Sequence, residues 1–289
     1  MHRMAFVSAL LMSVAGIPAA QSAELAELWR TTGFDLPESV SWDQDAQAFF
    51  VSNIGGDPMS KDGNGTISKV NPDGSIADAA WANGMDAPKG IDIANGTLYV
   101  SDVDHVVAFD VASGERLADY SVPGAVFLND IYAAPDGRVF VSDTFGNAVF
   151  VIQSGEASLV SRDPLLAGAN GLTMIGNDLI VADLGDASNG FDKIVPGTVV
   201  KIDLATNAVS YFGSPDSLGV LDGIEPDGQN VLVTDNAGGR LLLMAPGETG
   251  VEVGKLEPGA ADLEYVPGEN LIVVPQTQTN MVVAYRWTP

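Results

Sequence analysis

One short phrase occurs six times along this chain of 289 residues. Each copy starts with a residue that leads into a short apolar stretch, passes through a turn, and enters a second apolar stretch. The second stretches read AFFVSN, TLYVSD, RVFVSD, DLIVAD, NVLVTD and NLIVVP. The copies recur roughly every 40 to 50 residues, a period typical of propellers and solenoids. This repeat limits the possible folds more than any other feature of the chain.

The pattern within the copies predicts β-strands. Each of the first five copies contains four short stretches with the composition and turn signals of strands. The sixth copy has three, DLEYVP, NLIVVPQ and MVVAYRW, before the sequence stops at Pro289. Its fourth strand is most simply supplied by residues 25–30, which would close the ring and leave no open edge.

We therefore predict an all-β fold: a six-bladed β-propeller with four-stranded blades, formed by a single domain over residues 24–289. The N-terminal strand is expected to complete the last blade. A pair of β-sandwich domains is the main alternative. It would not explain a regular period along the whole chain.

The charge of the chain limits its partners. There are 38 Asp and Glu residues against 13 Lys and Arg residues, a formal net charge of -25. Nucleic acid is excluded as an expected partner, because binding phosphates requires clustered Lys and Arg. An anionic membrane surface is disfavoured for the same reason. Such acidity favours solubility, and a subset of the carboxylates is available to bind a cation.

The N-terminus has the pattern of a secretory signal. His2 and Arg3 precede the apolar run AFVSALLMSVAGI, and the small residues of PAAQSA follow it. We expect residues 1–23 to be a signal peptide cleaved between about residues 20 and 23, and the mature protein to be periplasmic or secreted. The run is short for a membrane anchor, so no membrane insertion of the mature form is expected. The chain has no cysteine, which excludes disulfides and thiolate ligands.

The repeat also predicts the position of a site. In a propeller the first strand of each blade lines the central channel, and successive antiparallel strands bring the start of strand one and the end of strand two to the same mouth. The first residue of each copy, here called its lead residue, should therefore face the others across that mouth. The six lead residues are Glu38, Lys89, Asn129, Asn170, Asp222 and Ala261. The ends of the second strands should lie nearby: Asn53, Asp102, Asp143, Asp183 and Asp235.

Four of the lead residues offer oxygen: Glu38, Asn129, Asn170 and Asp222. Mixed carboxylate and amide oxygens suit a hard cation such as Ca²⁺. Zinc and copper are disfavoured, because the set has no imidazole or thiolate. The chain has two histidines, one of them in the expected signal peptide, so a Ser-His-Asp triad is not expected in the mature protein. A hydrolytic base would have to be a carboxylate or a metal-bound water.

Simpler structural roles are open for each of these residues. Asn, Asp and Ser before a strand often form local turn hydrogen bonds, and the aspartates that end the second strands are typical caps. Lys89 could pair with a carboxylate, contact an anionic substrate, or neutralise charge in the channel. Asp130 and Asp262 lie one residue beyond the lead position, and Asp262 would replace Ala261 if the last strand were offset.

Several segments resemble the SMP-30/gluconolactonase/luciferin-regenerating-enzyme family, which is also similar to the diisopropyl-fluorophosphatase group. The segments are PESVSWD (37–43), FLNDIYAAPDGRVFVSDT (127–144), ANGLTM (169–174) and LDGIEPDGQNVLVTDNAGGR (221–240). The resemblance covers essentially the whole mature chain. It implies that Glu38, Asn129, Asn170 and Asp222 hold one divalent cation in the channel, the same four residues that the repeat selects.

The resemblance implies a Ca²⁺-dependent hydrolase that opens a lactone or similar ester. Asp222 would activate water while remaining a metal ligand, and a small molecule would be the substrate. We expect a substrate-binding or supporting role for Lys89, Asn53, Asp130, Asp183 and Asp262. Two alternatives remain open: a non-catalytic binding propeller with a structural cation, and a phosphotriesterase-like enzyme. The sequence does not determine the oligomeric state, and a monomer is compatible with each of these hypotheses.

Overall fold

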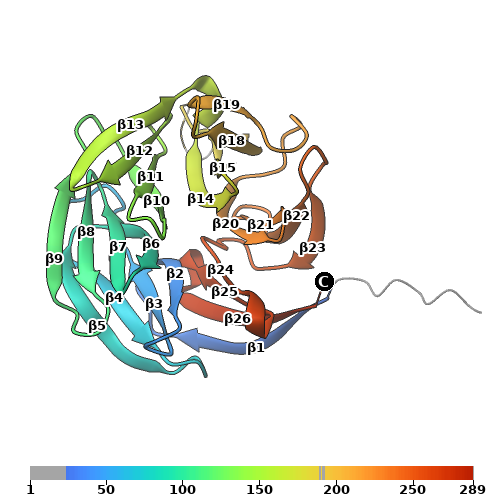
Figure 1. The fold of residues 1–289 in the computed structure, drawn as a ribbon. Helices are drawn as coiled ribbons and strands as arrows, with labels where there is room; N and C mark the ends of the chain where they lie inside the picture. Colours follow the sequence, from blue (N-terminus) through green and yellow to red (C-terminus); the bar gives the residue numbers. More distant parts are fainter. Residues whose placement is uncertain (1–23, 189, 191–192, 289) are drawn as a thin grey trace, which may run out of the picture.

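A computed structural model describes residues 24–188, 190 and 193–288. The expected signal peptide, residues 1–23, lies outside the described residues. Six four-stranded antiparallel sheets stand around a common axis (Figure 1). The prediction of a six-bladed, four-stranded propeller is confirmed. No helix in the described ranges is long and apolar enough to cross a membrane.

Blades 1 to 5 are each built from four strands in chain order, from the channel outwards. Blade 1 contains β2 (Pro37–Asp43), β3 (Ala48–Asn53), β4 (Gly65–Val70) and β5 (Ile76–Met85). Blade 2 contains β6 (Pro88–Ala94), β7 (Thr97–Asp102), β8 (His105–Asp110) and β9 (Arg116–Ser121). Blade 3 contains β10 (Leu128–Ala133), β11 (Val139–Asp143), β12 (Ala148–Gln153) and β13 (Glu156–Arg162).

The second half of the ring repeats this order. Blade 4 contains β14 (Ala169–Ile175), β15 (Asp178–Asp183), β18 (Val199–Asp203) and β19 (Ala208–Tyr211). Blade 5 contains β20 (Leu221–Asp227), β21 (Asn230–Asp235), β22 (Arg240–Met244) and β23 (Val251–Lys255). Blade 6 contains β24 (Glu264–Val266), β25 (Leu271–Gln276), β26 (Met281–Thr288) and, as its outer strand, β1 (Glu24–Thr32).

The two ends of the chain close the ring. Strand β1 pairs antiparallel with β26, from Glu24 opposite Thr288 to Thr32 opposite Met281. In Figure 1 the blue β1 runs beside the red β26. The prediction that an N-terminal strand completes the last blade is confirmed. The pairing covers the edge that β26 would otherwise expose.

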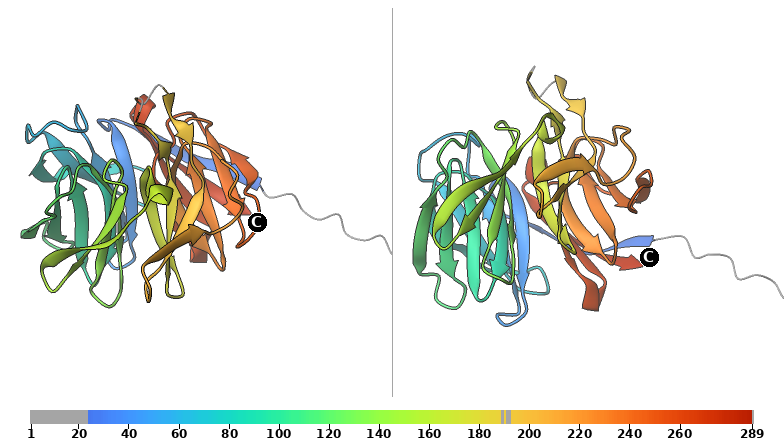
Figure 2. Two further views of the ribbon diagram at one scale, coloured as in Figure 1. Left: turned by 90° about the horizontal axis from the view of Figure 1, so that it is seen from above. Right: turned by 45° about the horizontal axis from the view of Figure 1, so that its top comes forward.

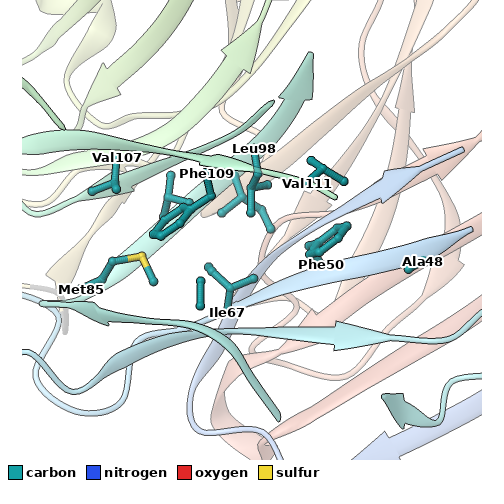
Figure 3. Close-up of a cluster of buried hydrophobic side chains, with 11 residues drawn as sticks. Ala48, Phe50, Ile67, Met85, Leu98, Val107, Phe109 and Val111 are labelled. Carbon is teal, nitrogen blue, oxygen red and sulfur yellow. The ribbon is translucent and has the colours of Figure 1, made fainter. Parts of the chain in front are cut away.

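The hydrophobic core lies between the blades. Each pair of neighbouring sheets encloses its own cluster of buried apolar side chains, because alternate residues of every strand face an adjacent blade. Figure 3 shows the cluster between blades 1 and 2, where Phe50 and Ile67 meet Leu98, Val107 and Phe109. Full burial of one such side chain contributes about 1.5–3 kcal/mol. The six clusters hold the blades in place and leave the channel to polar residues.

Two long connections lie at the mouth where the lead residues gather. They follow the second strands of blades 1 and 4, which stand on opposite sides of the ring (Figure 1). The second connection contains a short hairpin that the sequence analysis did not predict, β16 (Gly185–Asp186) paired with β17 (Val195–Pro196). This hairpin projects from one face of the ring (Figure 2).

Glycines let neighbouring inner strands approach each other. A Cβ at Gly90 would lie 2.4 Å from the Cα atom of Asp130 and 2.6 Å from the carbonyl oxygen of Asn129, both backbone atoms of the next blade. A side chain at this position therefore requires the backbone of one strand to move. Gly268, in the turn between β24 and β25, has no atom within 4 Å of the equivalent position.

We predict that Gly90→Ala lowers the free energy of unfolding by about 1–3 kcal/mol, the usual cost of overpacking. The reason is that the added methyl group meets backbone rather than a mobile side chain. Thermal denaturation of the mature protein measures the effect. Gly268→Ala is the matched control and should change stability by less than about 0.5 kcal/mol. Equal effects of the two substitutions would contradict the close approach of β6 and β10.

Candidate metal centre at the mouth of the ring

A β-bulge opens every inner strand and positions the lead residue. In blade 3, Leu128 pairs with Asp143 and Ile131 pairs with Val141. Asn129 and the residue after it therefore share one position opposite a single residue of β11. The same shift occurs in blades 1, 2, 4 and 5 and, between β24 and β25, in blade 6. All six lead residues thus have the same register at the same mouth.

The small polar residue in the second strand supports the bulge. It stands opposite the bulge, and its hydroxyl group accepts the backbone N–H that the bulge removes from the sheet ladder. Three such bonds are present, at 2.8–2.9 Å: Ser39 N to Ser52 Oγ, Asp130 N to Ser142 Oγ, and Gly223 N to Thr234 Oγ1. Two hydroxyl groups also donate to the next blade's lead residue: Ser101 to the Asn129 carbonyl and Thr234 to the Ala261 carbonyl. This explains why Ser or Thr recurs in the repeated phrase.

In blades 1 to 5, the polar residue that ends the second strand fixes the segment leading into the inner strand. Asp102 accepts the amides of Asp86 and Ala87, and Asp143 accepts those of Val126 and Phe127. Three more residues bind backbone amides at equivalent places: Asn53, Asp183 and Asp235. The predicted site residues Asn53 and Asp183 therefore act as loop caps in this structure.

The four predicted oxygen ligands occupy the same register at the mouth, and Asn170 and Asp222 are in direct contact. Asn170 Nδ2 donates to Asp222 Oδ1 over 3.1 Å, joining blades 4 and 5. Asn129, Asn170 and Asp222 are buried, whereas Glu38 is partly exposed. Glu38 Oε2 and Asn129 Oδ1 are buried atoms without a hydrogen-bond partner. Both orphaned atoms are acceptors, and no N–H or O–H of the described residues satisfies them.

Two residues that the sequence analysis missed hold these ligands in place. Thr144 Oγ1 accepts a bond from Asn129 Nδ2 at 3.1 Å and donates to the Ala169 carbonyl of the next blade. Asn236 Nδ2 donates to Asp222 Oδ2 at 2.8 Å. Thr144 and Asn236 each directly follow the repeated phrase, in VSDT and VTDN, so their shared register was the available signal.

The electrostatics of the mouth favour neutral carboxyl groups in the absence of a cation. Desolvation raises the pKa of Glu38 well above its usual range, and the charges of Asp222 and Asp262 raise it further. Burial raises the pKa of Asp222 to about 6, although the amide groups of Asn236 and Asn170 act in the opposite direction. Burial also lowers the pKa of Lys89 to about 8.

The remaining predicted residues form ties between blades. Asp130 Oδ2 accepts the Leu172 amide of blade 4 at 2.6 Å. Asp262 Oδ2 accepts the Ser39 hydroxyl of blade 1 at 2.5 Å. Asp262 does not replace Ala261, because the bridge between Ala260 and Gln276 keeps Ala261 at the lead position.

A second group of carboxylates, not predicted from sequence, occupies a lower level of the channel. It lies three residues after the lead positions and comprises Asp92, Glu225 and Glu264. These side chains help to line a cavity of about 220 Å³ together with Tyr132 and Thr173. Burial raises the pKa of Asp92 to about 7. All three carboxylates lie three residues after a lead residue, and this shared spacing in the sequence was the signal that could have predicted them.

No group of three or more His, Cys, Asp or Glu residues is arranged to hold a metal in the part of the chain that the structure describes. The candidate set at the mouth is of a different type, because only two of its four members are carboxylates. Its donors are two carboxylate and two amide groups, all oxygen ligands of the kind that Ca²⁺ accepts.

Comparison with solved structures places this fold among known propellers. A gluconolactonase from Xanthomonas campestris matches with a TM-score of 0.66 and 15% identity, over 92% of this chain and 90% of its own. The luciferin-regenerating enzyme matches with a TM-score of 0.64 and 14% identity, over 93% and 96%. The chain has the fold of these enzymes. The resemblance stated from the sequence motifs is therefore confirmed at the level of the fold.

The same fold is shared by a protein of another reaction class. Virginiamycin B lyase from Staphylococcus aureus matches with a TM-score of 0.62 and 15% identity, over 92% of this chain and 99% of its own. No protein-family model and no curated protein matches the sequence. The comparisons thus establish the architecture, and the chemistry has to be argued from the residues.

We predict that the metal-free mature protein is less stable at pH 8 than at pH 5. Asp92, Asp222 and Asp262 have pKa values of about 7, 6 and 7 in the folded chain, against about 4 when unfolded. A carboxyl group whose pKa is higher in the folded than in the unfolded chain stabilises the fold when it is protonated. This contribution to the free energy of unfolding is fully present below about pH 4 and is lost as the pH rises through 6 to 7. Lys89 stays charged in folded and unfolded chains below about pH 8, so it adds no slope there.

The melting temperature in EDTA should fall on the order of 5–10 °C between pH 5 and pH 8. Repeating the series in 0.5 M NaCl separates buried from exposed groups, because salt at about this concentration screens surface repulsion. A melting temperature that rises with pH, or a fall that salt abolishes, would contradict the prediction.

Proposed function

We propose that this chain is an exported, metal-dependent hydrolase that opens a lactone or a similar ester at the mouth of its channel. The observation that supports this most is the pair of orphaned acceptors, Glu38 Oε2 and Asn129 Oδ1. Leaving a buried acceptor unsatisfied costs about 1–3 kcal/mol. A cation bound between them would satisfy both atoms at once.

The chemistry of the donor set favours Ca²⁺. Glu38 and Asp222 supply carboxylate oxygens, and Asn129 Oδ1 supplies an amide oxygen. Asn170 donates its amide nitrogen to Asp222, and rotation of that amide group would present its oxygen instead. Four oxygen donors without nitrogen or sulfur suit a hard cation. These four residues would hold the ion.

When bound, the cation would polarise the ester carbonyl as a Lewis acid. Asp222 is the residue of this set best placed to accept a proton from water. Without a cation its pKa is about 6, so it is mostly ionised at neutral pH, and a bound cation would favour the ionised form further. The amide group of Asn236 fixes one of its oxygens. Burial of Asn129 and Asn170 limits the access of bulk water to this point.

The structural neighbours support the hydrolase reading without fixing the substrate. A gluconolactonase shares the fold, and the donor set agrees with an ester-opening reaction. A phosphotriesterase-like reaction would use the same residues and is the second candidate enzyme. The third candidate is a binding propeller in which the cation only stabilises the channel. Export to the periplasm or beyond rests on the sequence of residues 1–23.

We predict that Asp222→Asn lowers kcat for lactone hydrolysis about 100-fold or more, because the variant loses the proton acceptor. Initial rates on a panel of lactones and phosphotriesters measure the change and separate the two candidate enzymes. Asp45→Asn is the matched control, since Asp45 is exposed and lies in the turn between β2 and β3, at the opposite end of β2 from Glu38. Full lactonase activity of Asp222→Asn with metal bound would show that the base is another group.

We predict that the purified protein binds one divalent cation per chain and that its removal lowers the melting temperature. The effect should be largest at pH 8, where the lead carboxylates repel each other without a counter-ion. Elemental analysis and calorimetric titration of Ca²⁺ into EDTA-treated protein measure it. Glu38→Gln should weaken binding at least about 10-fold, whereas the exposed Glu115→Gln should not. A protein without a bound cation and with no response to EDTA would contradict the centre.

A further inference from the structure

Blade 2 departs from the other blades at one backbone hydrogen bond. In five blades, the carbonyl two residues before the lead position accepts the amide that follows the second strand. These bonds, at 2.8–3.1 Å, are Ile54 N to Leu36 O, Thr144 N to Phe127 O, Leu184 N to Gly168 O, Asn236 N to Val220 O, and Thr277 N to Gly259 O. In blade 2 the equivalent carbonyl, that of Ala87, accepts Lys89 Nζ at 2.9 Å.

The chain adopts an unfavourable conformation at the residue whose amide is displaced. Val103 follows the second strand of blade 2 and has φ of 52°. A β-branched residue rarely adopts positive φ, because its Cβ substituents crowd the backbone. In the described part of this blade, no backbone amide replaces the lost donor to Ala87. The blade gives up a regular hydrogen bond, and its carbonyl binds the side chain of Lys89.

The ammonium group of Lys89 is held but not satisfied. Its Nζ atom lies 4.5 Å from the centre of the Phe127 ring, and the residue is 1% exposed. An ammonium group has three N–H donors, and Ala87 is the one hydrogen-bond acceptor it has among the described residues. Lys89 forms no ion pair there, although the chain carries a net charge of -25.

Packing alone does not explain this arrangement. Burying an unpaired ammonium group costs several kcal/mol, and a methionine of similar length would fill the same space. The charges of Glu38 and Asp102 raise the pKa of Lys89, but neither carboxylate forms an ion pair with its ammonium group among the described residues. The ammonium group instead rests on a carbonyl and an aromatic ring, which leaves two N–H groups available to a ligand.

Lys89 stands beside the proposed metal ligand Glu38 at the mouth, because each charge acts on the pKa of the other group. Lys89 and Glu38 are neighbouring members of the ring of lead residues, and Glu38 is partly exposed. The two carboxylates Glu38 and Asp222 balance the charge of a bound dication. Among the six lead residues, Lys89 is then the one charge left without a partner of opposite sign, and its free N–H groups suit a singly charged anionic group.

We propose that Lys89 is a specificity-determining residue whose ammonium group receives a carboxylate of the substrate, so that the site selects lactones bearing a free carboxylate. This rests on the proposed function of the mouth as a lactone site. No covalent step is assigned to Lys89. Its role is to orient the ring of an anionic lactone through two charge-assisted hydrogen bonds.

The test is a binding measurement that does not depend on turnover. The probes are a five-membered lactam bearing a carboxylate and the same lactam bearing a primary amide, because lactams resist hydrolysis. Calorimetry with Ca²⁺ present should show that the mature wild-type protein binds the carboxylate form about 10- to 100-fold more tightly than the amide form. Lys89→Met should abolish this preference, whereas Lys89→Arg should retain part of it.

A matched control separates Lys89 from cation–π lysines in general. Lys69 lies on β4, away from the channel, with Nζ 5.6 Å from the centre of the Phe50 ring. Lys69→Met should leave the preference unchanged. Lys89→Met is expected to fold, because a methionine sulfur packs well on an aromatic ring. If it does not fold, Lys89→Gln and the wild-type preference itself provide the test.

The proposal is overturned if the wild-type protein binds both probes equally or binds neither, or if Lys89→Met keeps the preference. This failure is distinct from failure of the proposed function. If the protein hydrolyses neutral lactones but shows no preference for the carboxylate probe, the proposed function is supported and the proposed role of Lys89 is wrong. If the protein prefers the carboxylate probe but hydrolyses no lactone, the proposed role of Lys89 is supported and the proposed hydrolase function is wrong.

Discussion

The bulge at the start of each inner strand is the constraint on which the rest of the mouth depends. Two consecutive residues of the inner strand stand opposite a single residue of the second strand. Each blade therefore presents two side chains at the mouth of the channel, where a regular strand would present one. The lead residue becomes available to a ligand, and the next residue ties one blade to another, as Asp130 does with Leu172. The hydroxyl group of Ser142 or Thr234 satisfies the amide that the bulge displaces. The repeated VSD-like phrase is therefore a support for the site as much as a strand ending.

Much of the fold could be predicted because its signals are local and repeated. Short apolar stretches separated by turn signals located the strands, and the three strands of the last copy implied a donor at residues 25–30. The register of the lead residues also followed from the repeat alone. The roles of Asp130 and Asp262 could not be predicted in this way, because their partners, Leu172 and Ser39, belong to other copies. Contacts between blades depend on the twist and spacing of the ring, which a single copy does not encode.

The same limit applies to the lysine of blade 2. The sequence shows Lys89 where other copies have Glu, Asn or Asp, but it does not show which acceptor the ammonium group uses. That depends on a carbonyl two residues away and on the backbone of Val103. The hairpin β16–β17 was missed for a related reason, since two-residue strands have no measurable period. In each case a physical contact outside the repeat decided the outcome.

The pairing of β1 with β26 has a consequence for how the site comes into existence. It joins residue 24 to residue 288, so the ring closes only when nearly the whole chain is present. Contacts between such distant residues form late and slowly during folding. Six side chains from six blades then take their places in one closing event. A chain that ended between Asp222 and β26 would contain every proposed metal ligand and still lack the closed ring that holds them together.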